Sequence, residues 1–62
     1  MLLRLPDILR RTGLRRSALL AMVQRGAFPA PVRIGDARAV AWHAAEVDAW
    51  IAALPRVAVP AL

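Results

Sequence analysis

The sequence predicts one small α+β domain, mostly α, in which two helices are followed by a β-hairpin and a third helix. Three observations lead to this fold class. Apolar residues recur at intervals of three and four on both sides of a turn at Gly13, a proline-rich break follows at 28–31, and two short segments after it alternate between faces. A chain of 62 residues encloses a single core. We expect the domain to cover residues 1–54 and a short tail to cover 55–62.

The first helix is expected from Pro6 to about Thr12. Proline is tolerated in a first helical turn because its missing N–H would have no partner there, and the carboxylate of Asp7 faces the positive end of the helix dipole. Gly13 ends the helix, since glycine readily takes the left-handed conformation found at helix ends. The residues expected to face the core are Leu5, Ile8 and Leu9.

The second helix opens on Arg15-Arg16-Ser17 and meets no helix-breaking residue before Gly26. Its core stripe is expected to be Leu19, Met22 and Val23, with Leu14 packed beneath it. Its opposite face is expected to present Arg16, Ser17, Leu20, Ala21 and Gln24.

A hairpin follows the proline-rich break at 28–31, because prolines lack a donor and push the preceding residue towards extended geometry. Residues 32–34 and 39–42 are the expected strands, and residues 35–38 have turn chemistry. This alternation predicts inward-facing side chains at Val32, Ile34, Val40 and Trp42. It leaves Arg33 in solvent and Arg38 near the tip.

The third helix begins between His43 and Ala45 and is expected to end at Pro55. Its apolar stripe, which should close the core, consists of Val47, Trp50, Ile51 and Leu54. Trp42, Trp50 and Phe28 fall on inward faces, so we expect core packing in place of the base stacking used by single-strand binders. The order of elements is that of a small winged helix-turn-helix domain.

The charge balance favours a polyanion as partner. The chain has nine arginines, no lysine and four acidic residues, for a net charge of +5. Such a surface attracts nucleic acid, and arginine favours planar, two-point contacts to phosphate or guanine. A GC-rich genome would also produce a chain with arginine and no lysine.

The composition argues against several other classes. There is no cysteine, which excludes disulfides and thiolate zinc sites and favours a reducing compartment. His43 is the only histidine, so we expect no metal or other cofactor, and no nucleophile–base pair suggests an enzyme. The longest apolar run, Ala18 to Val23, has six residues and is too short for a membrane span. No secretory signal is visible, so a soluble, cytoplasmic protein is expected.

Between Leu3 and Leu54 the sequence carries an ordered set of short motifs: Leu5-Pro6 with Ile8-Leu9, Thr12-Gly13-Leu14, Arg16-Ser17, Arg25-Gly26 with Phe28-Pro29, Pro31-Val32-Arg33-Ile34-Gly35, Arg38-Ala39-Val40 with Trp42, and Glu46-Val47 with Trp50-Ile51. This set resembles the AlpA family of small prophage-type regulators and excisionase-like proteins, which have a MerR-like winged-helix fold. The resemblance implies a transcriptional regulator of phage-related genes, or a directionality factor that helps an integrase excise a mobile element. The sequence does not choose between them.

Double-stranded DNA is the partner we expect, with the second helix in a major groove and the hairpin in the adjacent minor groove. Arginines at a helix N-terminus can hold a phosphate. On the helix face, polar side chains can contact base edges and a leucine can contact a thymine methyl. An arginine at the wing tip can enter a narrow minor groove. The candidate DNA-contacting residues are Arg15, Arg16, Ser17, Leu20, Gln24, Arg33 and Arg38. Each has the alternative of being ordinary solvated surface.

One domain of this size can neutralise about four to six phosphates, which gives a log–log salt slope of roughly −4 to −5. We therefore expect several copies to bind clustered sites as a homo-oligomer on DNA, with an integrase or another DNA-bound protein as a further partner.

A different class of function is also open. Ala18, Leu20 and Ala21 stand where relatives tend to carry Thr, Tyr or basic residues. This apolar face and the tail Val57–Leu62 would then form a protein-interaction or oligomerisation module.

Overall fold

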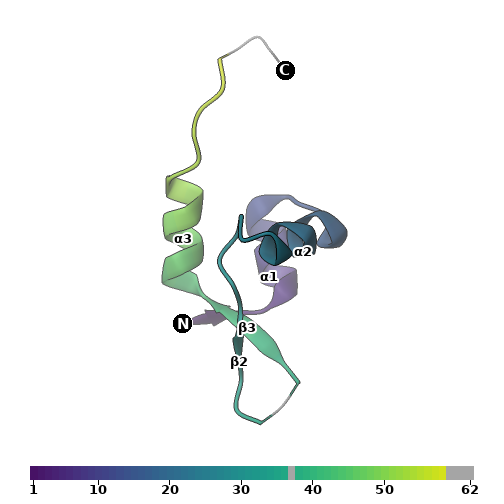
Figure 1. Ribbon diagram of the computed structural model, residues 1–62. Helices are drawn as coiled ribbons and strands as arrows, with labels where there is room; N and C mark the ends of the chain where they lie inside the picture. Colours follow the sequence, from purple (N-terminus) through teal and green to yellow (C-terminus); the bar gives the residue numbers. More distant parts are fainter. Residues whose placement is uncertain (37, 59–62) are drawn as a thin grey trace.

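The computed structural model describes residues 1–36 and 38–58. These residues fold as a three-stranded antiparallel sheet with three helices, in the order β1 (Leu2–Leu3), α1 (Leu5–Thr12), α2 (Arg16–Gln24), β2 (Val32–Arg33), β3 (Val40–His43) and α3 (Ala44–Ala52). In Figure 1, α3 and the α1–α2 pair lie side by side, and the β2–β3 hairpin projects at the end opposite the C-terminal segment. The predicted fold class, a mostly helical α+β domain with the layout of a small winged helix-turn-helix, is confirmed.

Local signals in the sequence define α1. Pro6 lies in its first turn, and the backbone N–H of Arg4 donates to the Asp7 carboxylate at 3.2 Å. At the other end, Gly13 has φ +73° and its N–H donates to the carbonyl of Leu9 at 2.8 Å. The predicted start and stop of this helix are therefore confirmed, and the core face is too, because Ile8 is buried.

Helix α2 also lies where the sequence predicts it. It begins at Arg16, after the extended backbone of Arg15, and ends at Gln24, two residues before Gly26. Leu19 is completely buried. The other core-facing residues expected here pack against the core while remaining partly exposed: Leu14, Met22 and Val23.

The inward faces predicted for the hairpin are partly wrong. Val32 lies opposite Ala41 and Arg33 lies opposite Val40. Residues opposite each other in an antiparallel pair point to the same side, so Val32 cannot share a face with Val40 and Trp42. Trp42 is buried as predicted, whereas Ile34 and Val40 are each 36% exposed. The observed strands also differ from the expected ones by about one residue at their ends, and part of the expected turn, Ala37, lies outside the described residues.

The sheet has a third strand that the sequence pattern did not reveal. Strand β1 pairs antiparallel with β3, with Leu2 opposite His43 and Leu3 opposite Trp42, which makes β3 the central strand. The N–H of Ala44 extends the pairing by donating to the carbonyl of Met1 at 2.9 Å. Two residues are too few to show an alternating pattern, so this strand is defined by its partner in the fold.

Helix α3 begins within the predicted range but ends earlier than predicted. Its last helical residue is Ala52, and Ala53 caps it, so Pro55 does not set its end. Of the predicted apolar stripe, Val47 is buried and Trp50 and Ile51 are partly buried. Leu54 lies beyond the helix and is 48% exposed, so it does not close the core as expected. Among the described residues, no helix is long and apolar enough to cross a membrane.

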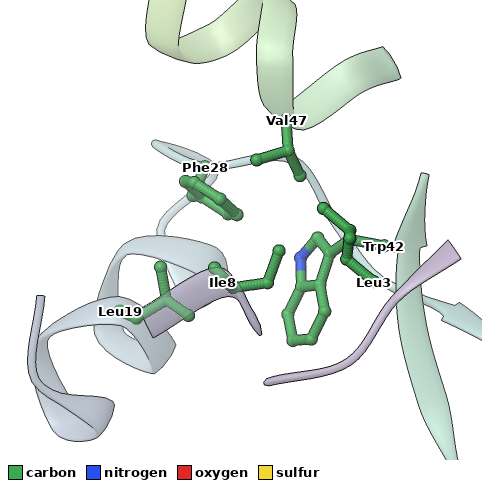
Figure 2. Close-up of a cluster of buried hydrophobic side chains, with 6 residues drawn as sticks. All are labelled: Leu3, Ile8, Leu19, Phe28, Trp42 and Val47. Carbon is green, nitrogen blue, oxygen red and sulfur yellow. The ribbon is translucent and has the colours of Figure 1, made fainter. Parts of the chain in front are cut away.

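The core connects the sheet to all three helices. Figure 2 shows its six buried side chains, which are Leu3, Ile8, Leu19, Phe28, Trp42 and Val47. The proline-rich segment after α2 is fixed to this core by two indole N–H groups, because Trp42 donates to the carbonyl of Pro29 at 2.8 Å and Trp50 to that of Ala27 at 2.9 Å. Phe28 also meets Trp50 edge to face, with ring centroids 4.7 Å apart. The structural role predicted for the three aromatic side chains is confirmed.

Candidate nucleic-acid interface

The turn between α1 and α2 is held by side-chain and backbone hydrogen bonds. The hydroxyl of Thr12 donates to the carbonyl of Ile8 at 2.9 Å and accepts from the N–H of Leu14 at 3.2 Å. Together with the Gly13 N–H bond to the Leu9 carbonyl, these contacts fix the direction in which α2 leaves α1. Sequence reasoning missed this positioning role of Thr12. A short hydroxyl side chain in the last helical turn before a glycine was the available signal.

The N-terminus of α2 is uncapped. Arg15 occupies the capping position with extended backbone, and within the described residues no side chain accepts from the first-turn N–H groups. The first N–H groups of any helix lack intrahelical partners and carry a partial positive charge. Arg15 and Arg16 are both exposed beside these groups. The sequence-predicted pair of arginines therefore lies where a phosphate would find two guanidinium groups and free backbone donors.

The exposed face of α2 matches the predicted surface with one difference. Ser17 and Gln24 are exposed on the side opposite Leu19, and Arg16 is exposed in the first turn. Leu20 is only partly exposed. Its contribution to any contact in a groove is therefore smaller than the sequence suggested.

Two other arginines form ion pairs and are therefore not candidate DNA-contacting residues. Arg10 pairs with Asp7 within α1, and Arg11 of α1 pairs with Asp48 of α3 at 2.5 Å. By contrast, no salt bridge among residues 1–36 and 38–58 involves the arginines of the candidate site, which are Arg15, Arg16, Arg33 and Arg38. Of the seven arginines outside these two ion pairs, five lie at the ends of α2 or on the hairpin, and the other two are Arg4 and Arg56.

The hairpin arginines lie apart from the α2 cluster. Arg33 is exposed on β2 opposite Val40, and Arg38 is exposed in the loop that leads into β3. Figure 1 shows the hairpin projecting beyond the helices, so Arg33 and Arg38 lie on a different part of the molecule from the arginines of α2. A partner that touches both sets must contact two separate elements.

One arginine near this surface was not predicted from the sequence. Arg25 is exposed and caps the C-terminus of α2, directly after Gln24. It lies nine positions after Arg16, which is about 13.5 Å along the helix axis at 1.5 Å per residue. Its position immediately before Gly26 was the signal that could have placed it at a helix end. It adds a positive charge at the C-terminal end of α2.

Metal-binding side chains do not gather anywhere in the part of the chain that the structure describes. No three His, Cys, Asp or Glu side chains lie close enough there to hold an ion. His43 is exposed at the N-cap of α3. The chemistry that the surface offers is therefore that of guanidinium groups, backbone donors and a few polar side chains.

Comparison with known proteins gives two findings. Residues 1–56 match the model of a family described as prophage CP4-57 regulatory protein (AlpA). The chain is also 40% identical over 50 residues to the uncharacterized protein ORF88 of Enterobacteria phage P4, an alignment that covers 81% of this chain and 56% of the relative. The chain thus spans little more than half the length of that relative. No solved structure matches the chain.

Proposed function

Because the chain belongs to the family of the prophage regulatory protein AlpA, we propose that this small phage-related regulator acts by binding double-stranded DNA through α2 and the hairpin. The observation that carries the proposal is the distribution of charge. Arginines that no acid neutralises lie beside the uncapped N-terminus of α2 and on the hairpin, while Asp7 and Asp48 neutralise arginines elsewhere.

Helix α2 is the element that enters the major groove. Arg15 and Arg16 hold a phosphate together with the first-turn N–H groups, a contact that positions the protein without reading sequence. Ser17 and Gln24 are exposed on the same face and supply hydrogen bonds to base edges. With so few polar groups, sequence preference is modest, and the exposed edge of Leu20 adds contact with a thymine methyl.

The hairpin contacts the neighbouring part of the duplex. Arg38, in the loop, enters the minor groove, where a narrow A·T-rich segment concentrates negative potential. Arg33 contacts a phosphate beside it. Because the arginines of α2 and those of the hairpin lie on separate parts of the domain, one domain spans two grooves with few contacts in each. Several copies bound to clustered sites raise the total affinity.

Recovery of bound genomic fragments tests this function directly. The protein is incubated with sheared DNA of its host at physiological salt, and the retained DNA is sequenced. We expect a few loci that share a short motif. Uniform retention that disappears as salt is raised would contradict sequence preference, and no retention at low salt would contradict DNA binding.

Transcriptional control and excision would use the same protein surface. The two roles differ in whether the bound DNA is bent. A directionality factor must shape a nucleoprotein assembly together with an integrase, so it bends its site. Circularly permuted fragments that carry the retained motif reveal such a bend by their mobility in a gel. A position-dependent mobility favours the architectural role, and a constant mobility favours simple regulation.

Protein interaction through α2 is the second candidate, favoured by the exposure of Ala18 and Ala21 on this helix. In this case the face and the apolar tail bind a protein and the arginines serve only solubility. Ala21→Arg would then abolish association measured by sedimentation and leave DNA retention unchanged. If DNA binding carries the function, Ala21→Arg changes DNA affinity or motif preference instead.

A further inference from the structure

An apolar groove of about 210 Å³ lies between α3 and the α1–α2 turn. Its lining is formed by Arg11, Thr12, Leu14, Met22, Trp50, Ile51 and Leu54. The Arg11–Asp48 ion pair lies at its edge, so the charge of Arg11 is already satisfied and the rest of the lining is almost entirely apolar. The family match and the phage relative assign no role to this groove.

The groove has the size for one or two aliphatic side chains. Pockets for cofactors and drug-sized ligands measure about 300–1,000 Å³. A dry apolar cavity of about 150 Å³ accepts a molecule of the size of benzene. The volume here lies just above that smaller value, which suits side chains of a peptide segment better than a cofactor.

The chain carries an apolar segment of matching character directly after the groove. Leu54, a lining residue, is followed by Pro55–Ala58, which is exposed and has no regular structure, and Val57 is 67% exposed. The sequence continues with Val59-Pro60-Ala61-Leu62, so residues 57–62 contain no polar or charged side chain. An exposed apolar run of this kind is costly in water unless it has a partner.

The direction of the described tail argues against its own groove as the binding site. Figure 1 shows residues 55–58 leaving α3 away from the α1–α2 pair.

We propose that the groove binds residues 57–62 of a second copy of the chain. In extended geometry Val57 and Val59 point to the same side, so both can enter the groove together. The contact joins two different surfaces of the molecule, which makes it heterologous and able to link copies head to tail. It uses Leu14 and Met22 and leaves the exposed face of α2 free.

The contact forms without DNA, but its consequence for regulation rests on the proposed function. Copies joined through their tails bring neighbouring α2 helices to adjacent sites at a raised effective concentration. A domain with few contacts per copy then binds clustered sites tightly.

Sedimentation of the full chain without DNA measures the contact. We compare the wild type with Val57→Glu in the tail and Leu54→Glu at the groove rim, both at largely exposed positions that the folded core does not need. Ala49→Glu, exposed on the opposite side of α3, is the matched control. We expect self-association to weaken at least about tenfold in the first two variants, or 1.4 kcal/mol, and to remain unchanged in the control. Circular dichroism checks that all three variants are folded.

A second measurement identifies where the tail binds. A synthetic peptide of residues 56–62 is added to the isotope-labelled full chain, and we expect backbone amide shifts at Thr12, Leu14 and Met22 but not at Ser17 and Gln24. A wild type that stays monomeric at millimolar concentration without peptide shifts overturns the proposal, as does self-association that both glutamate variants retain. A third result also overturns the proposal: the wild type is monomeric, and the Val57→Glu substitution shifts the amide signals of the groove residues. In that case the tail binds the groove of its own domain. DNA retention by the same variants, measured separately, shows whether the proposed function holds independently.

Discussion

Replacing Arg16 by Gln is the sharpest test of the proposed interface, because Arg10 offers a control with the same loss of charge. Arg16 is exposed at the uncapped start of α2, whereas Arg10 pairs with Asp7 within α1. If the global charge of the chain attracts DNA, the two substitutions have equal effects. If the position of the arginine matters, only Arg16→Gln weakens binding.

The expected size follows from counterion release. Each neutralised phosphate contributes about −0.9 to the log–log salt slope, so the four arginines of the candidate site give about −3.6 and a loss of about 150-fold in affinity between 50 and 200 mM salt. Without Arg16 the slope falls to about −2.7 and the loss to about 40-fold. Arg10→Gln should keep the wild-type slope, since Asp7 already offsets that charge.

Fluorescence anisotropy with a labelled duplex, titrated at four or more salt concentrations, yields these slopes. The duplex carries the motif recovered from genomic DNA, and a scrambled duplex shows whether the change applies to all sequences, as expected for a phosphate contact. Equal slopes for the two variants would refute the assignment of Arg16 to the interface. A reduced slope for Arg10→Gln alone would place the DNA on the α1 side of the domain.

Substitutions at three positions test the fold that positions this interface, each by denaturant unfolding. Trp42→Phe removes the buried N–H bond to the Pro29 carbonyl and should cost about 1–3 kcal/mol; a cost near zero would mean that this bond does not hold the linker. Gly13→Ala should cost about 1–2 kcal/mol from the positive φ alone, because an added Cβ meets no atom within 4 Å, and Gly13→Asn should cost less. Equal costs for alanine and asparagine would contradict this cause. Arg11→Gln breaks an exposed ion pair and should cost less than about 1 kcal/mol, with the difference disappearing at high salt.

The helices were predictable because their signals are local. These signals are Pro6 near the start of α1, Gly13 at its end and the apolar spacing that follows. Each acts within one or two helical turns, so it can be recognised without knowing what packs against the helix. The hairpin shows where such reading fails. Its strands were expected from alternation, but which residues share a face depends on the pairing register, and that register places Val32 with Ala41 instead of Trp42.

The candidate site was partly predictable for the same reason. The exposure of Ser17 and Gln24 follows from the position of Leu19 on a helix with a buried side, whereas Arg16 is exposed at the start of the helix. Their role in DNA binding stays a prediction. The neutralisation of Arg11 was not predictable, because the Arg11–Asp48 pair joins residues 37 positions apart in the chain. The partial burial of Leu20 likewise depends on how α2 packs.

The sequence by itself determined the order and type of the main elements, the family, and the basic character of α2 and the hairpin, because these depend on composition and on short-range spacing. Only the tertiary structure decided that Leu2–Leu3 forms a strand, that Leu54 lies at the rim of a groove, and that Arg11 pairs with Asp48. Strand pairing and a groove between helices join residues that are distant in sequence. Such contacts exist only after the chain has folded, so no local pattern can encode them alone.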